Sequence, residues 1–193
     1  MMQLYLDSAT NVLYIALGKN GTLIDYTIRI GRQDHSKHIV DRIDLLLKRN
    51  NTTIDDINAI TVGSGPGSYT GLRASVMVAK MIAYTKRIKL FEVSSLYFLS
   101  SGYPNIKAPM IDARNGNVFC GIYNDCEQLL EDGLRKTTDL QKLALQYQAK
   151  PIYLDDFNYE IVLAKIDQMA KEVKEIHSFV PKYLRQTEAE RNL

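Results

Sequence analysis

The sequence has no tryptophan, five prolines and only two cysteines among its 193 residues. Cys120 and Cys126 are too few for a disulfide framework, and their spacing fits no zinc-binding motif, so we expect both to be structural or incidental. No run of about 18 uninterrupted apolar residues is present, which excludes a typical membrane-spanning helix. The first residues, Met1–Asp7, also lack the basic and apolar regions of a secretion signal. We therefore expect a soluble, cytoplasmic protein.

A strong excess of one charge is absent too. With 24 lysines and arginines against 22 aspartates and glutamates, the net charge is +2. A balance this close to zero gives no general attraction to nucleic acids or membranes, and ordinary solvated surfaces explain it. The hydrophobic share of 46% is enough to bury a core, and the length suits one domain or two small ones.

Glycine is scarce in the second half of the chain. Eight of the 11 glycines come before residue 103, and four lie in the run Gly63–Arg73, GSGPGSYTGLR. This run joins an apolar, strand-like segment at 59–62 to a helix-like segment at 74–83. A Gly-rich turn at a helix N-terminus presents free N–H groups and the positive end of the helix dipole, which suits an anion. It lacks the P-loop lysine and the dinucleotide spacing, so a structural turn capped by Ser68 and Thr70 is the alternative.

Apolar periodicity and turn signals predict an α/β protein. The chain is expected to open with a three-stranded meander and then to alternate helices and strands up to a boundary at Gly102–Pro104. The predicted strands are 4–6, 12–17, 22–30, 59–63, 88–93, 108–111, 117–123 and 151–154, and the predicted helices are 35–50, 74–83, 96–101, 138–148 and 159–173. We predict domains at 1–102 and 103–193 and a loose polar tail at 186–193.

The helix predicted after the Gly-rich turn is apolar nearly all round. Within 74–84 only Ser75 and Lys80 are polar. A helix that only covers a sheet shows a polar outer face, so a second face of this helix should also be covered. Met77 and Met81, four residues apart, suit an adaptable contact surface. The cover is either another part of the same chain or a partner.

Catalytic and metal-binding patterns are weak. His35 and His38 stand close together at the start of a predicted helix, but no carboxylate pattern nearby offers a third ligand, so we expect no metal site. No nucleophile-elbow sequence is present, which leaves a peptidase without visible catalytic residues.

Six motifs in order along nearly the whole chain nevertheless match one family. They are Asp7–Thr10 (DSAT), His35-Ser36, Gly65–Arg73 (GPGSYTGLR), Val93–Leu96 (VSSL), Asp112–Arg114 (DAR) and Pro181–Arg185 (PKYLR). The chain thereby resembles the TsaB (YeaZ) family, whose members are needed to make N6-threonylcarbamoyladenosine in bacterial tRNA. It departs from the family pattern at Ser8, where threonine is usual, and in a shorter second half.

The resemblance implies an actin/Hsp70/sugar-kinase-like (ASKHA) fold, with two lobes of mixed β-sheets flanked by helices and an abridged second lobe. ATP-using members hold phosphates with Gly-rich turns from both lobes. By that analogy the candidate phosphate or nucleotide contacts are Asp7, Thr10, Gly65, Gly67, Ser68 and Thr70. The second lobe offers only the scattered Gly116, Gly121 and Gly133. We therefore expect no cofactor, and a nucleotide only at a partner interface.

The resemblance also implies a role without catalytic residues of its own. The chain is expected to be a dimerisation and activating subunit that supports a TsaD-like catalytic subunit together with a TsaE-like ATPase, to form a homodimer when alone, and to meet tRNA only indirectly. The candidate partner interface on the first two helices is Ile39, Ile43, Leu46, Leu47, Arg73, Val76, Met77, Lys80, Met81 and Tyr84. The alternative is a stand-alone small ATPase or kinase of the same fold.

Overall fold

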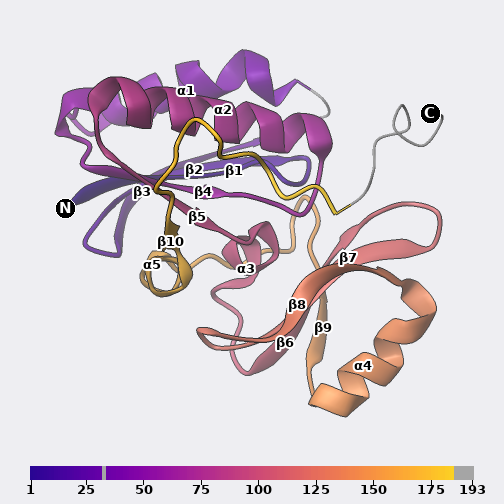
Figure 1. The fold of residues 1–193 in the computed structure, drawn as a ribbon. Coiled ribbons are helices and arrows are strands. Elements are labelled where there is room, and N and C mark those ends of the chain that lie inside the picture. Colours follow the sequence, from indigo (N-terminus) through magenta and orange to yellow (C-terminus); the bar gives the residue numbers. More distant parts are fainter. Residues whose placement is uncertain (32–33, 185–193) are drawn as a thin grey trace.

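The computed structural model describes residues 1–31 and 34–184, which form two β-sheets with helices (Figure 1). The first sheet has the strand order β10-β5-β4-β1-β2-β3. Its strands are β1 (Met2–Asp7), β2 (Val12–Lys19), β3 (Thr22–Ile30), β4 (Ala59–Gly63), β5 (Lys89–Val93) and β10 (Lys171–Glu172). Strands β1 to β3 are antiparallel, as the predicted meander requires, and β4 and β5 add to β1 in parallel.

The second sheet has four strands in the order β8-β7-β6-β9. They are β6 (Ile106–Asp112), β7 (Asn117–Asn124), β8 (Glu127–Lys136) and β9 (Lys150–Tyr153), and helix α4 (Leu140–Tyr147) follows β8. The sequence did not predict β8, because five of its ten residues are charged and it lacks the apolar alternation that marks a strand. Two mixed sheets flanked by helices confirm the predicted ASKHA fold class.

Helices α1 (His35–Arg49) and α2 (Tyr69–Lys86) lie together on one face of the first sheet (Figure 1). Successive residues of a strand point to opposite faces, and β1 shows the consequence. Leu4 and Leu6 pack beneath α1 and α2, whereas Tyr5 joins a second core with Leu96 and Leu163. This second core also holds residues of the other sheet, so it joins the two lobes. Its short helices are α3 (Ser95–Ser100) and α5 (Leu163–Met169).

Helix α5 is shorter than the helix predicted at 159–173, and this prediction was wrong at both ends. The backbone of Ala170 is already extended, with φ −69° and ψ 138°. Lys171 and Glu172 then pair with Glu92 and Phe91 as strand β10 at the edge of the first sheet. At the other end, Glu160 N donates to the carbonyl of Leu99 instead of forming a helical bond. The division at residue 102 stays a prediction, although β10 from the second half belongs to the first sheet.

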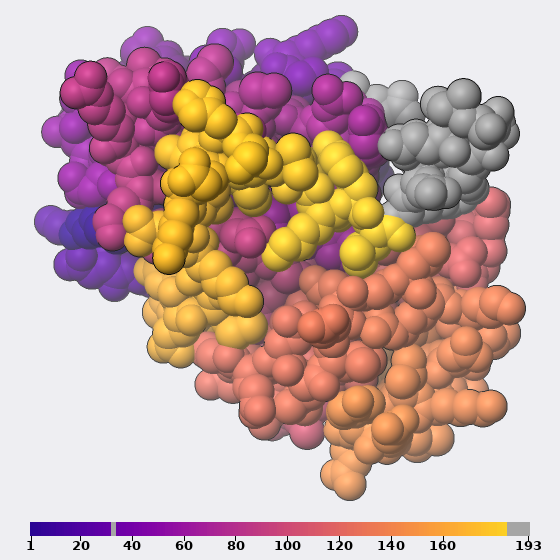
Figure 2. Space-filling view, in the orientation of Figure 1, coloured from indigo at the N-terminus to yellow at the C-terminus, as the bar shows by residue number. Residues whose placement is uncertain are grey.

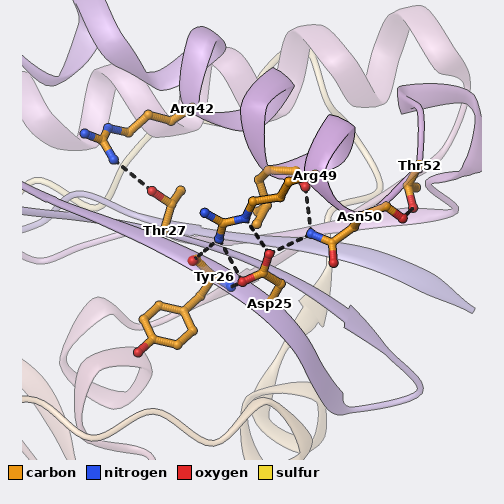
Figure 3. Close-up of polar contacts among 8 residues, drawn as sticks. Asp25, Tyr26, Thr27, Arg42, Arg49, Asn50 and Thr52 are labelled. Atoms are coloured by element: carbon orange, nitrogen blue, oxygen red, sulfur yellow. Dashed lines mark hydrogen bonds and ion pairs between the residues drawn. The ribbon is translucent and has the colours of Figure 1, made fainter.

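The outer edge of the first sheet, at β3, is covered by arginines from α1 (Figure 3). Arg42 Nη1 donates to Thr27 Oγ1 at 2.8 Å and to the Ile28 carbonyl at 3.2 Å. Arg49 binds the Asp25 carboxylate and also donates to the Tyr26 carbonyl. The guanidinium groups thus satisfy backbone acceptors that an edge strand otherwise leaves open to a further strand.

Candidate functional site

The Gly-rich turn packs against the turn between β1 and β2 and against the start of α3. Ser68 N donates to the Ala9 carbonyl at 2.7 Å. On the other side, the Gly65 carbonyl accepts from Ser95 N at 2.8 Å, and Gly65 N donates to Ser95 Oγ at 3.1 Å. Gly65 and Ser68 thus bind other parts of the same chain. The peptide bond between Gly65 and Pro66 is cis.

Two of the glycines are required by close backbone approach. A Cβ atom on Gly67 would lie 2.4 Å from the Ala9 carbonyl oxygen, and one on Gly71 would lie 2.0 Å from the Ser8 carbonyl oxygen. Ser8 Oγ also donates to the Gly71 carbonyl at 2.7 Å. The space against these glycines is therefore filled by residues 8 and 9 of the same chain, which explains the glycines without a phosphate.

Asp7 is enclosed beneath this turn, with no part of its side chain exposed. Its Oδ1 accepts from Ala9 N at 2.9 Å, whereas its buried Oδ2 has no hydrogen-bond partner among residues 1–31 and 34–184. Gly63 leaves room for it, because a Cβ there would lie 1.8 Å from Oδ2. Burial raises the pKa of Asp7 to about 7, against smaller lowering by the Ser95 hydroxyl and the Ala9 amide.

The other candidate nucleotide contacts lie around the same turn but differ in access. Thr10 is half-buried, and its Oγ1 accepts from Val12 N at 3.1 Å. Ser68 caps α2 by accepting from Gly71 N at 3.3 Å, which is the structural role considered from the sequence. Gly65 is buried, and among the six candidates only Ser68 and Thr70 are exposed. The structure brings the six candidates together, and their contact with a nucleotide stays a prediction.

The two histidines at the start of α1 contact Thr10 and Asp34. His35 Nε2 lies 3.3 Å from the Thr10 carbonyl oxygen, and burial lowers the pKa of His35. His38 Nε2 lies 3.6 Å from Asp34 Oδ2. Over residues 1–31 and 34–184, no group of three or more histidines, cysteines, aspartates or glutamates is arranged to hold a metal ion.

The predicted partner interface is divided by the structure into buried and outward-facing residues. Five of its ten members lie in the core between the helices and the first sheet, namely Ile39, Ile43, Leu46, Leu47 and Val76. Because they are at most 4% exposed, they cannot form a surface for a partner. Their three- and four-residue spacing marked the face of the helix that covers the sheet. The outer face keeps Met77, Met81 and Tyr84, which are 59, 56 and 60% exposed, with Arg73 beside them.

One flank of α2 is covered by the C-terminal segment of the same chain, residues 173–184 (Figures 1 and 2). Val173 N donates to the Leu90 carbonyl at 2.8 Å, and Lys182 N donates to the Ser64 carbonyl at 2.7 Å. Between these points lies Lys80, the remaining residue of the predicted interface. Its Nζ binds the backbone of the segment. The sequence analysis missed this segment. Its signal is an apolar residue at every third position, namely Val173, Ile176 and Phe179. The rest of the chain from 185 onward, including the tail 186–193, lies outside the described residues.

A polar cluster lies between the lobes. Ser94, at the start of α3, donates to Asp132 of β8, and Tyr123 of β7 donates to the same carboxylate. Burial raises the pKa of Asp132 despite these bonds. Nearby, Tyr97 Oη donates to Cys126 Sγ at 3.4 Å. Burial raises the pKa of Cys120 to about 11, so this thiol is not an activated nucleophile at neutral pH.

The chain also resembles known proteins. The family model for TsaD, tRNA N6-adenosine threonylcarbamoyltransferase, matches residues 29–160. The tRNA threonylcarbamoyladenosine biosynthesis protein TsaB of Bacillus subtilis is 34% identical over 134 residues, covering 68% of this chain and 58% of that protein. The TsaB of Escherichia coli is 30% identical over 129 residues, covering 64% and 55%. The chain thus spans somewhat more than half the length of these relatives.

Solved structures agree on the fold. YeaZ from Pseudomonas aeruginosa superimposes with a TM-score of 0.72 at 20% sequence identity, over 95% of this chain and 99% of that chain. A second Pseudomonas aeruginosa structure, described as similar to peptidase YeaZ, gives 0.77 at 21% identity with the same coverage. No helix in the described part of the chain is long and apolar enough to cross a membrane. On these matches, the chain belongs to the TsaB (YeaZ) family of tRNA threonylcarbamoyladenosine biosynthesis proteins.

Proposed function

We propose that this protein is a non-catalytic subunit that binds and activates a TsaD-like catalytic subunit in the formation of threonylcarbamoyladenosine in tRNA. The observation that carries the proposal is the row of exposed Met77, Met81 and Tyr84 on the outer face of α2. Large apolar side chains grouped on one helix face favour contact with another protein, and methionines adapt to a partner's shape. Val40 and Leu45 of α1, 54 and 63% exposed, add apolar surface on the neighbouring helix.

The match of the TsaD family model to this chain supports a pairing of related folds. A partner of the same fold would present its own equivalents of α1 and α2, and two such pairs would form a four-helix contact. In the absence of this partner, the same face would pair two copies of the chain. A TsaE-like ATPase would join the complex, tRNA would be contacted through the catalytic subunit, and the assembly would act in the cytoplasm.

The experiment is co-elution with the cognate TsaD-like protein after replacing Met77 and Met81 with glutamate. Two buried carboxylates at the contact would each require desolvation, so we expect the complex to weaken at least 100-fold and to dissociate on a sizing column. The matched control is Leu145→Glu on α4, which changes an exposed leucine of the other lobe. Unchanged complex formation by the double variant would contradict the proposed interface.

The alternative, a stand-alone ATPase or kinase, has less support. Asp7 is enclosed, and Ser8 and Ala9 fill the space against the Gly-rich turn. Calorimetric titration of the isolated protein with Mg-ATP distinguishes the two functions. We expect no saturable binding in the micromolar range, whereas micromolar binding with turnover would favour the ATPase.

A further inference from the structure

The C-terminal segment 176–184, which we call the strap, follows α2 along most of its length. Near the end of α2, the rings of Tyr84 and His177 meet edge to face with centroids 4.6 Å apart. Near its beginning, the rings of Tyr69 and Tyr183 lie 4.7 Å apart. Figure 2 shows the strap as a continuous yellow band on the surface of the first lobe. Both ends of the helix therefore carry an aromatic ring that rests on the strap.

Lys80 holds the middle of the strap. Its Nζ donates to the carbonyl of His177 at 2.9 Å and to the carbonyl of Phe179 at 2.6 Å. Hydrogen bonds from a charged donor are stronger than neutral ones, and two on neighbouring carbonyls fix the path of a segment without regular structure. Ile176 and Phe179 can then pack against the core beneath α2. Lys80 therefore holds the strap against α2.

The strap also determines the shape of the outer face. Tyr84 and Tyr69 are 60 and 42% exposed, and their remaining contacts include the rings of His177 and Tyr183. If the strap left the helix, both tyrosines would lose these supports and the apolar flank of α2 would be uncovered. A partner would then have to reorder these side chains on binding, which lowers affinity.

We propose that the strap must be seated on α2 for the outer face to bind a helical partner subunit, and that Lys80 is the positioning residue that seats it. The coupling to partner binding rests on the proposed function, because it concerns the same face. The strap thus makes the affinity of a surface in the first lobe depend on the last part of the chain, through contacts between Lys80 and residues 177 and 179.

The test compares Lys80→Met with the wild type in two measurements. Methionine keeps much of the apolar stem of lysine but donates no hydrogen bond. Amide hydrogen exchange should become faster at Phe179 and Lys182, and the Kd for the TsaD-like subunit should rise about tenfold, within the usual range of coupling between two sites. Lys80→Arg, which keeps a cationic donor, should restore both. Lys86 lies on the same helix as Lys80 and forms an exposed ion pair with Asp55. Lys86→Met should therefore change neither the exchange rates nor the Kd.

The outcomes separate this proposal from the proposed function. If Lys80→Met speeds exchange in the strap but leaves the Kd unchanged, the coupling is wrong and the proposed function stands. If exchange in the strap does not change, Lys80 does not hold the strap. The Met77→Glu and Met81→Glu variant should lose binding with normal exchange in the strap. If the wild type fails to bind the TsaD-like subunit at all, the proposed function and the coupling both fail.

Discussion

Replacing Gly71 with alanine is expected to destabilise the protein by about 3 kcal/mol or more, the upper range for overpacking. The added Cβ would lie 2.0 Å from the carbonyl oxygen of Ser8, and neither atom belongs to a flexible side chain. The backbone of α2 or of the β1–β2 turn would have to move. Such a movement would also disturb the bond from Ser8 Oγ to the Gly71 carbonyl. Urea denaturation followed by circular dichroism measures the loss.

Gly116→Ala is the control for this prediction. Gly116 has φ +71°, but no atom of the part of the chain that the structure describes lies within 4 Å of the position that a Cβ would take. Alanine there meets only the backbone strain of a left-handed conformation, about 1 kcal/mol. Alanine in a helix interior is intrinsically favoured over glycine by a similar amount, so propensity alone would make Gly71→Ala stabilising. A smaller loss for Gly71→Ala than for Gly116→Ala would contradict the packing described for the turn.

Asp7→Asn is expected to make the protein more stable at pH 8 and to leave it little changed at pH 4. In the wild type, burial raises the pKa of Asp7 from 3.8 to about 7 in the folded state. Between these values the unfolded chain has lost the proton that the folded chain keeps. The free energy of unfolding of the wild type therefore falls as the pH rises through this window, by up to roughly 1.4 kcal/mol per unit.

Asparagine does not titrate, so Asp7→Asn removes this pH-dependent loss of unfolding free energy. Its amide oxygen can still accept from Ala9 N. The gain at pH 8 should be about 2 to 4 kcal/mol, measured as the difference between variant and wild type in urea at pH 4, 6 and 8. Asp112→Asn is the matched control, because Asp112 Oδ1 accepts from Arg114 N in the same kind of turn but is exposed. A pH-independent difference between Asp7→Asn and the wild type would show that Asp7 is not a buried acid.

Much of the fold could be predicted because local sequence patterns mark most strands of the first sheet. Strands β1 to β4, α1 and the start of α2 each carry an apolar period and a turn or capping signal, and six motifs in order indicated the family. Strand β8 was missed because its charged residues hide the strand pattern, and β10 because two residues are too short for any period. Strand β8 forms by pairing with β7, and β10 forms by pairing with β5. A pattern within a short stretch of sequence does not contain these pairings.

The candidate site was less predictable. The resemblance grouped the Gly-rich turn and Asp7 as candidate nucleotide contacts, but the sequence could not reveal that Ser8 and Ala9 fill the space against the glycines. From the sequence alone, the apolar residues of α1 that face the sheet cannot be distinguished from those that face outward. The apolar character of α2 did predict a second cover. Over one flank this cover is the strap, whose residues His177 and Phe179 lie 97 and 99 positions after Lys80 in the chain.

The strap has a consequence for how the protein is made. Residue 86, the last of α2, leaves the ribosome 98 residues before residue 184, the last described residue of the strap. At roughly 5 to 20 residues per second, the nascent first lobe spends about 5 to 20 s with one flank of α2 bare. Sites for Ile176 and Phe179 stay empty during that time. The nascent chain should therefore be recognised by hydrophobic-binding chaperones until the strap has emerged, and the first lobe should reach full protease resistance only after residue 184 has left the ribosome.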